Sequence, residues 1–191
     1  MEFTLIEKLG NTGKDGETYL IKNGNKFYAL KKYKNKKSVN KIVKEAQLQY
    51  EASILGISPK IYECNLDKKY VIMDKLDINL FSLLKRKKGK LSIRNQKKII
   101  QIIRLLDNIN IFHGDPNPAN FMFRNDKLYI IDFGFSKKIN KTLIKKLATN
   151  TPNMDYMILG FILKCKELFK NSNYTHLKKF ISKNNIIKFQ L

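Results

Sequence analysis

The sequence has few of the residues that mark several protein classes. It contains two cysteines in 191 residues, no tryptophan and four prolines. The two thiols, Cys64 and Cys165, are too few to stabilise a secreted protein of this size through disulfides, and they fit a reducing compartment. The longest apolar runs, such as 157–163, are too short to cross a membrane, and the first residues show no basic-then-apolar signal pattern. We therefore expect a cytoplasmic, intracellular protein with no membrane partner.

Acidic side chains are also scarce, because 16 Asp and Glu stand against 38 Lys and Arg, a formal net charge of +22. Only four of the basic residues are arginine. Since Arg reads phosphates and bases better than Lys, this disfavours sequence-specific recognition of nucleic acid. Non-specific contact with RNA or another polyanion follows from the charge alone. We favour a compositional cause for the positive charge, because Lys, Asn and Ile have A/T-rich codons. Such a composition would suit a large DNA virus or an AT-rich microbe.

The apolar content of 43% is normal for a globular protein, and the length suits one domain or two small lobes. The pattern of apolar residues and turn signals changes near residues 74–78. Before that point it predicts strands at 3–9, 18–22, 27–32, 61–66 and 70–73, and a helix at 39–55. After it, the pattern predicts helices at 80–84, 92–110, 155–169 and 177–187, with strands at 121–123 and 128–131. The fold class is therefore α+β.

Two features of the strand-rich part suggest phosphate binding. Gly10, Gly13 and Gly16 punctuate the loop between the first two strands, where glycine lets the backbone approach a polyphosphate. Lys31 ends the strand Ala29-Leu30-Lys31 and can reach phosphate oxygens as a point charge. Each signal is weak alone, because a hairpin loop and one of 34 lysines explain them equally well.

Two features of the second part are more specific. In His113-Gly114-Asp115-Pro116-Asn117-Pro118-Ala119-Asn120, two prolines fix a loop in which Asp115 can accept a proton and Asn120 offers a neutral oxygen to a hard cation. In Ile130-Ile131-Asp132-Phe133-Gly134, a carboxylate leaves an apolar strand before a flexible joint. Ordinary Asp-rich turns rarely fall in this order and spacing by chance.

The order of glycine loop, Ala-x-Lys, His-x-Asp-x-x-x-x-Asn and Asp-Phe-Gly resembles the protein-kinase-like superfamily over about residues 5–163. The resemblance implies a single bilobal domain over 1–191, with an N-lobe at about 1–74 and a reduced C-lobe at about 77–191. It implies ATP and Mg²⁺ as cofactors and a protein substrate.

The resemblance also implies the site. The three glycines would cover the ATP phosphates, and Lys31 would pair with the α- and β-phosphates. The carboxylate partner of Lys31 would be Glu45, with Glu51 as the alternative. Residues of the adenine pocket would be Met73 at its back and the backbone of Asp74 and Leu76 at its edge.

In the second part, the resemblance makes Asp115 the catalytic base, Asn120 and Asp132 the Mg²⁺ ligands, and His113 a support for the loop. Asp155 resembles a buried aspartate that braces the catalytic loop, and a helix N-cap is the alternative. Gly114 replaces an Arg that many regulated kinases use, and Asn117 replaces a Lys typical of Ser/Thr kinases. No Ala-Pro-Glu follows Asp132-Phe133-Gly134.

With these departures, the sequence resembles compact atypical kinases such as the KEOPS-complex kinase subunit, the RIO kinases and small viral kinases. The leading expectation is a protein Ser/Thr kinase, in a host cell if the protein is viral. The alternatives are a KEOPS-like kinase or ATPase subunit of a larger assembly that modifies tRNA, and a small-molecule phosphotransferase. A non-catalytic module is disfavoured, because it would not need Lys31, Asp115, Asn120 and Asp132 together.

Overall fold

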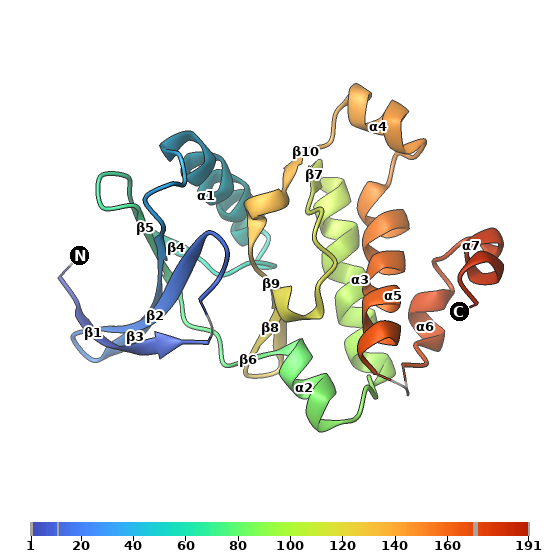
Figure 1. Ribbon diagram of the computed structural model, residues 1–191, viewed down its shortest axis with the longest axis horizontal. Helices are drawn as coiled ribbons and strands as arrows, with labels where there is room; N and C mark the ends of the chain where they lie inside the picture. The colour runs from blue at the N-terminus through green and yellow to red at the C-terminus, as the bar shows by residue number, and fades with distance from the viewer. Residues whose placement is uncertain (1, 11, 170–171, 191) are drawn as a thin grey trace. The chain divides into compact units, whose positions relative to one another are not determined.

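The computed structural model describes residues 2–10, 12–169 and 172–190 (Figure 1). The chain divides into two compact units. The first holds the residues up to Asp77 together with Ile131–Gly134, and the second holds Ile78–Ile130 and the residues from Phe135 onward. The first is built on a sheet and the second mainly on helices, so the predicted α+β class is confirmed.

The first unit is an antiparallel sheet of five strands in the order β1-β2-β3-β5-β4. The strands are β1 (Thr4–Leu9), β2 (Gly16–Asn23), β3 (Lys26–Tyr33), β4 (Ile61–Asn65) and β5 (Tyr70–Asp74). Helix α1 (Val39–Ile54) connects β3 to β4. Each predicted strand and the predicted helix of this part is present, with ends shifted by one or two residues, as is usual for element boundaries.

Side-chain alternation along β3 divides the core of this unit into two layers. Ala29 and Tyr33 lie in one cluster with Ile42 of α1, whereas Leu30 lies in the other cluster with Ile21 and Ile72. Residues two apart in a strand share a face. Lys31 therefore shares the α1 face of β3 with Ala29 and Tyr33, which places its ammonium on the side of the helix.

The second unit combines helices with short strands. They are β6 (Ile78–Asn79), α2 (Leu80–Arg86), α3 (Ile93–Asn108), β7 (Ile111–Phe112), η1 (Pro118–Asn120), β8 (Phe121–Arg124), β9 (Lys127–Ile130), β10 (Lys137–Lys138), α4 (Lys141–Leu147), η3 (Asn153–Met157), α5 (Ile158–Leu168), α6 (Thr175–Lys178) and α7 (Lys183–Lys188). The short helix η2 (Phe133–Phe135) spans the border of the two units. Strands β6, β8 and β9 form one small sheet, and β10 pairs with β7.

Helices α3, α5 and α6 enclose the core of the second unit. Phe161 of α5 meets Phe121 edge-on at 5.6 Å between ring centroids and lies 6.1 Å from the ring of Tyr174. The buried Gln96 of α3 accepts hydrogen bonds from the backbone N–H groups of His176 and Leu177, at 3.0 and 3.2 Å. Its side chain thereby satisfies two of the N–H groups that a helix start leaves open.

Sequence patterning was accurate for α3 and less so near the C-terminal end. The predicted cap of α3 is confirmed, because Ser92 Oγ accepts from the N–H of Asn95. The predicted helix at 155–169 begins instead with the π-helical turn η3. The predicted single helix at 177–187 is wrong, because Ser182 caps a new helix through the N–H of Asn185. Within the described ranges, none of the helices combines the length and apolar character needed to cross a bilayer.

Candidate active site

The glycine loop joins β1 to β2 in the first unit, and Asn11 within it lies outside the described residues. The loop closes through a hydrogen bond from Gly13 N–H to Gly16 C=O at 2.9 Å. Gly10 has φ +69°, a conformation that favours glycine. A Cβ at Gly16 would lie 2.3 Å from the carbonyl oxygen of Lys32, so only glycine fits there.

Polar side chains brace the base of this loop. Glu17 accepts from Lys8 and Thr12, each at 2.7 Å, and from the hydroxyl of Tyr19 at 2.5 Å. Hydrogen bonds from Lys8, Tyr19 and Thr12 stabilise the carboxylate and lower the pKa of Glu17 to about 2. The strand ends on both sides of the loop are therefore tied by one carboxylate.

Lys31, Glu45 and Asp132 come together in the first unit. Lys31 Nζ lies 2.6 Å from Glu45 Oε1 and 3.1 Å from Asp132 Oδ1. Glu45, rather than the alternative Glu51, is the carboxylate paired with Lys31. Burial lowers the pKa of the Lys31 ammonium, but the Glu45 and Asp132 carboxylates raise it more, so the net shift is upward and the ammonium keeps its charge.

A second lysine, missed by sequence reasoning, completes this cluster. Lys37 lies in the β3–α1 connection, where its Nζ contacts Glu45 Oε2 at 2.5 Å and Asp15 Oδ2 at 2.9 Å. The hydroxyl of Tyr33 donates to Glu45 Oε1 at 3.1 Å. Lys37 belongs to a run of five Lys in 31–37, and only its burial distinguishes it.

Asp132 has a backbone conformation that is rare for residues with a side chain. Its φ is +66°, in the left-handed region, where Asp is better tolerated than most residues. The next residue, Phe133, is buried and anchors the segment. A Cβ at Gly134 would lie 3.4 Å from Asp132 Oδ1, 3.5 Å from Glu45 Oε2 and 3.8 Å from Asp15 Oδ2. Three carboxylates therefore converge around Gly134.

The residues predicted for an adenine pocket lie at the end of β5 and just beyond it. Met73 is buried, and its sulfur accepts from Gln49 Nε2 at 3.4 Å. The N–H of Asp74 donates to Lys60 C=O at 3.0 Å, so this N–H already has a partner within the first unit. Leu76 is buried and follows the strand.

In the second unit, the loop that holds Asp115 is built from short-range turns. Asp115 Oδ1 accepts from the N–H of Asn117 at 3.2 Å, and Asn117 Oδ1 accepts from the N–H of Ala119 at 2.9 Å. Asn120 is buried, and its amide nitrogen lies 3.5 Å from Asp115 C=O, which directs its amide oxygen away from that carbonyl. Asn117 thus has a structural task as the cap of η1.

Gly114 is also explained by local structure. Its φ is +80°, and a Cβ there would lie 3.1 Å from the carbonyl oxygen of Phe135. An Arg at this position would strain the backbone and crowd that carbonyl. Both departures from common kinase motifs, Gly114 and Asn117, therefore have causes in the shape of this loop.

Asn153 anchors this loop. Its Oδ1 accepts from the N–H of His113 at 2.9 Å, and its Nδ2 donates to Ile111 C=O and to Asp107 Oδ1, each at 2.7 Å. Asp107 of α3 also accepts from the N–H of Met154 at 3.0 Å. Burial raises the pKa of Asp107, although these hydrogen bonds oppose the shift. His113 itself is fully buried, and Ser136 Oγ donates to its carbonyl.

The expectation that Asp155 is buried and braces the loop is wrong. Asp155 is exposed, and its carboxylate accepts from the hydroxyls of Thr149 and Thr151. The N-cap alternative is wrong as well, because Asp155 lies within η3, whose N-cap position is Pro152. The wide π-helical turn carries Asn153 inward. The sequence signal that could have pointed to Asn153 was an amide side chain directly after Pro152.

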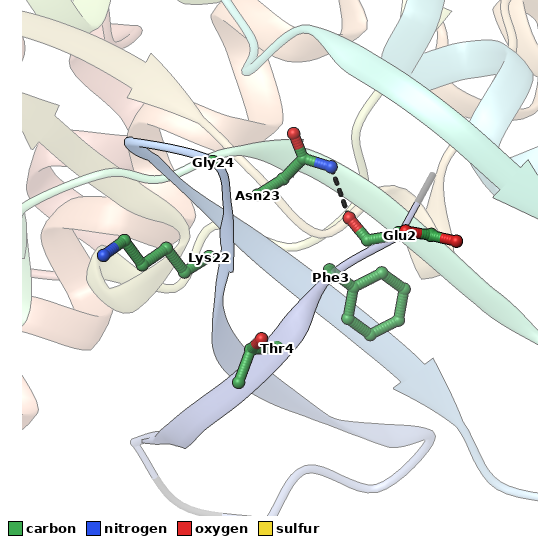
Figure 2. A pocket seen from close by; sticks show the side chains of 6 residues that line it. All are labelled: Glu2, Phe3, Thr4, Lys22, Asn23 and Gly24. Atoms are coloured by element: carbon green, nitrogen blue, oxygen red, sulfur yellow. Dashed lines mark hydrogen bonds between the residues drawn. The ribbon is translucent and has the colours of Figure 1, made fainter.

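An open pocket of about 650 Å³ lies at the β2–β3 turn of the first unit (Figure 2). It is lined by Glu2, Phe3, Thr4, Lys22, Asn23 and Gly24. Figure 2 shows the Asn23 amide turned toward the carbonyl of Glu2, to which it donates. None of the predicted site residues lines it. Among the described residues, no group of three His, Cys, Asp or Glu side chains is placed to hold a metal by itself.

Comparison with known proteins identifies the family. The model of the protein kinase domain matches residues 3–158, which run through both units. A probable serine/threonine-protein kinase of fowlpox virus is 29% identical over 127 residues, covering 62% of this chain and 41% of that protein. The serine/threonine-protein kinase MPS1 of Encephalitozoon cuniculi is 28% identical over 147 residues, covering 72% and 25%.

A third relative is not named as a serine/threonine-protein kinase. A probable bifunctional tRNA threonylcarbamoyladenosine biosynthesis protein of Methanosphaera stadtmanae is 29% identical over 117 residues, covering 60% of this chain and 22% of that protein. The chain spans less than half the length of these curated relatives. It belongs to the protein kinase domain family.

Proposed function

We propose that this protein is an ATP-dependent protein kinase that transfers the γ-phosphate of Mg·ATP to Ser or Thr hydroxyls of a protein substrate. The observation that carries the proposal is the placement of Lys31 between Glu45 and Asp132, at 2.6 and 3.1 Å. A lysine held by a buried carboxylate and a half-exposed one is suited to bind phosphate beside a divalent cation. Membership of the kinase family supports the same assignment.

The residues of this chain fit Mg·ATP. Gly10 has φ +69° and nothing lies within 4 Å of the place of a Cβ there, so the main chain of the glycine loop can lie close to phosphates. Asp132 and Asn120 offer carboxylate and amide oxygens, the ligands that Mg²⁺ prefers. When bound, Mg²⁺ would neutralise the charge of the β- and γ-phosphates. Lys31 would hold the α- and β-phosphates, and Glu45 would fix the direction of Lys31.

The second unit would position the acceptor hydroxyl of the protein substrate. Asp115 would orient this hydroxyl and accept its proton, since the loop holds its carboxylate through the N–H of Asn117. Asn153 and Ser136 hold the backbone of His113 two residues earlier and so fix the position of Asp115. Most of the acceleration would come from positioning and electrostatics, because phosphoryl transfer needs little covalent chemistry from the protein.

A radiolabelled-phosphate transfer assay tests the proposal. Asp115→Ala should abolish label on generic protein acceptors and leave equilibrium binding of Mg·ATP nearly intact, because Asp115 faces the acceptor. Asp132→Ala should weaken the binding of Mg·ATP itself. Asp155→Ala is the matched control, since this exposed carboxylate of the second unit should affect neither. Equal loss of nucleotide affinity in the Asp115 and Asp132 variants would contradict this division of roles.

A second candidate is a kinase or ATPase subunit of a larger assembly that modifies tRNA. The relative from Methanosphaera stadtmanae and the net charge of +22 favour it. Hydrolysis of ATP that depends on Asp115, without label on protein, would move the assignment to this candidate. A small-molecule phosphotransferase has less support, because Gly114 and Asn117, which suggested it, serve the shape of the loop.

A further inference from the structure

Five ionisable side chains meet in the first unit, and the mechanism above gives no task to two of them, Lys37 and Asp15. Lys37 is 7% exposed although lysine is rarely buried unless it is paired. Its ammonium joins two carboxylates from separate segments, Asp15 at the end of the glycine loop and Glu45 in α1. A buried lysine does not contribute to solubility. The bridge that Lys37 forms between two segments near the proposed nucleotide site therefore needs another explanation.

We propose that Lys37 is a positioning residue that ties the glycine loop to α1 and holds Glu45 in the orientation in which it pairs with Lys31. This role rests on the proposed function where it concerns nucleotide binding. Where it concerns the loop, it applies to the protein without a nucleotide.

The carboxylate of Glu45 shows why one lysine is not enough. Glu45 is 3% exposed, and its two oxygens are held separately, Oε1 by Lys31 and Oε2 by Lys37. Lys31 divides its charge between Glu45 and Asp132 and would also face the phosphates. A buried carboxylate needs full compensation, and Lys37 supplies it from the side away from the contact with Lys31.

The position of Lys37 is fixed by its surroundings. Its ammonium lies 4.8 Å from the centre of the Tyr33 ring, over which Lys31 also lies at 5.4 Å. Behind it, Lys69 Nζ donates to the carbonyls of Asn35 and Lys37 at 2.7 and 3.1 Å and holds the connection in place. The cation–π contact and the fixed backbone reduce the freedom of the Lys37 side chain.

The contact with Asp15 extends the network into the glycine loop. Asp15 C=O accepts from the N–H of Lys34 at 2.9 Å, so both its backbone and its side chain are held by the β3–α1 connection. The hydrogen bond from Lys37 lowers the pKa of Asp15. A carboxylate beside a phosphate-binding loop would repel phosphate, and Lys37 compensates that charge. The loop and α1 are thereby linked through a single ammonium.

The first experiment measures amide hydrogen exchange of the nucleotide-free protein, which requires no kinase activity. In Lys37→Met, exchange over residues 12–19 should rise by about tenfold, the change for roughly 1.4 kcal/mol of lost stability. Exchange in α3 should stay unchanged. Lys36→Met is the matched control, because Lys36 is the exposed neighbour with the same charge, and it should leave the loop as in the wild type.

Two further variants separate the two contacts of Lys37. Asp15→Asn removes the charge of the loop contact and leaves the contact with Glu45 as it is, so exchange should rise over 12–19 and not at the start of α1. Lys37→Arg keeps the charge and should restore most of the protection. High salt should resemble Asp15→Asn and not Lys37→Met, because salt screens the half-exposed pair more than the buried one. If Lys37→Met does not fold, these variants and the salt dependence decide the proposal.

Equilibrium binding of Mg·ATP is the second readout. Lys37→Met should weaken binding by about tenfold to a hundredfold, the range for residues that orient a binding group from behind. Lys37→Arg should recover most of it, and Lys36→Met should bind like the wild type.

Two results would overturn the proposal: identical behaviour of Lys37→Met and Lys36→Met in both measurements, or an equal rise of exchange throughout the protein, the mark of a purely structural role. A wild-type protein that does not bind Mg·ATP would instead contradict the proposed function, with the loop result still standing.

Discussion

The two units hold their candidate site residues by different physical means. In the first unit, two lysines and three carboxylates are held by contacts between full charges, several of them buried. In the second unit, the loop of Asp115 is held mainly by amide and backbone hydrogen bonds, with Asn153 at the centre and the Asp107 carboxylate as a partner of Asn153. Charge contacts depend on pH and salt, whereas neutral hydrogen bonds depend on geometry. The first unit should therefore respond to solution conditions and the second to changes of shape.

The largest expected effect is the loss of Asn153. Asn153→Ala removes the partners of His113 N–H and Ile111 C=O and one of the donors to Asp107. Leaving such buried groups unsatisfied should lower the free energy of unfolding by about 2–4 kcal/mol. Urea denaturation measures this change, and phosphate transfer should fall with it because Asp115 loses its support.

Asp155→Ala sharpens this result, because Asp155 is the residue that the sequence pattern suggested for the same task. As an exposed residue it should change the free energy of unfolding by less than about 0.5 kcal/mol. If the two variants were equally destabilised, the view that Asn153 holds the loop would have to be abandoned.

The next effect concerns shape alone. A Cβ at Gly160 of α5 would lie 2.6 Å from Pro116 Cγ and 3.0 Å from its Cβ, in a proline ring that cannot turn away. Gly160→Ala should therefore push the loop of Asp115 and lower the free energy of unfolding by about 1–3 kcal/mol. The turnover number should fall more than the affinity for Mg·ATP. Lys164→Ala, on the exposed side of the same helix, is the control and should change neither quantity.

The comparison of the two units also explains which elements and site residues could be predicted from the sequence. The strands of the first unit follow apolar alternation and turn glycines, and the ion pair of Lys31 and Glu45 lies where motif spacing predicts it. Lys37 was missed because one buried lysine cannot be distinguished in a run of lysines without tertiary contacts. Asn153 was missed because a π-helical turn changes which residue faces the loop, and helical periodicity assumes 3.6 residues per turn.

The smallest effect uses acid to separate the two units. The pKa of Glu17 is lowered from 4.5 to about 2 in the folded protein by the hydrogen bonds from Lys8, Tyr19 and Thr12. Its contribution to stability is present above pH 4.5 and is lost as the pH falls toward 2, because the unfolded chain takes up the proton first. The pKa of Asp107 in the second unit is raised by burial, so its contribution has the opposite sign and grows on acidification.

Glu17→Gln removes the titrating group and should flatten the loss of stability between pH 4.5 and 2. Urea denaturation at stepwise pH measures this, with Glu7→Gln, an exposed acid of β1, as the control that keeps the wild-type slope. Backbone amide NMR signals of β1 and β2 should weaken at a higher pH than those of α3. An unchanged slope in Glu17→Gln, or earlier loss of the α3 signals, would show that charge contacts do not govern the first unit more than the second.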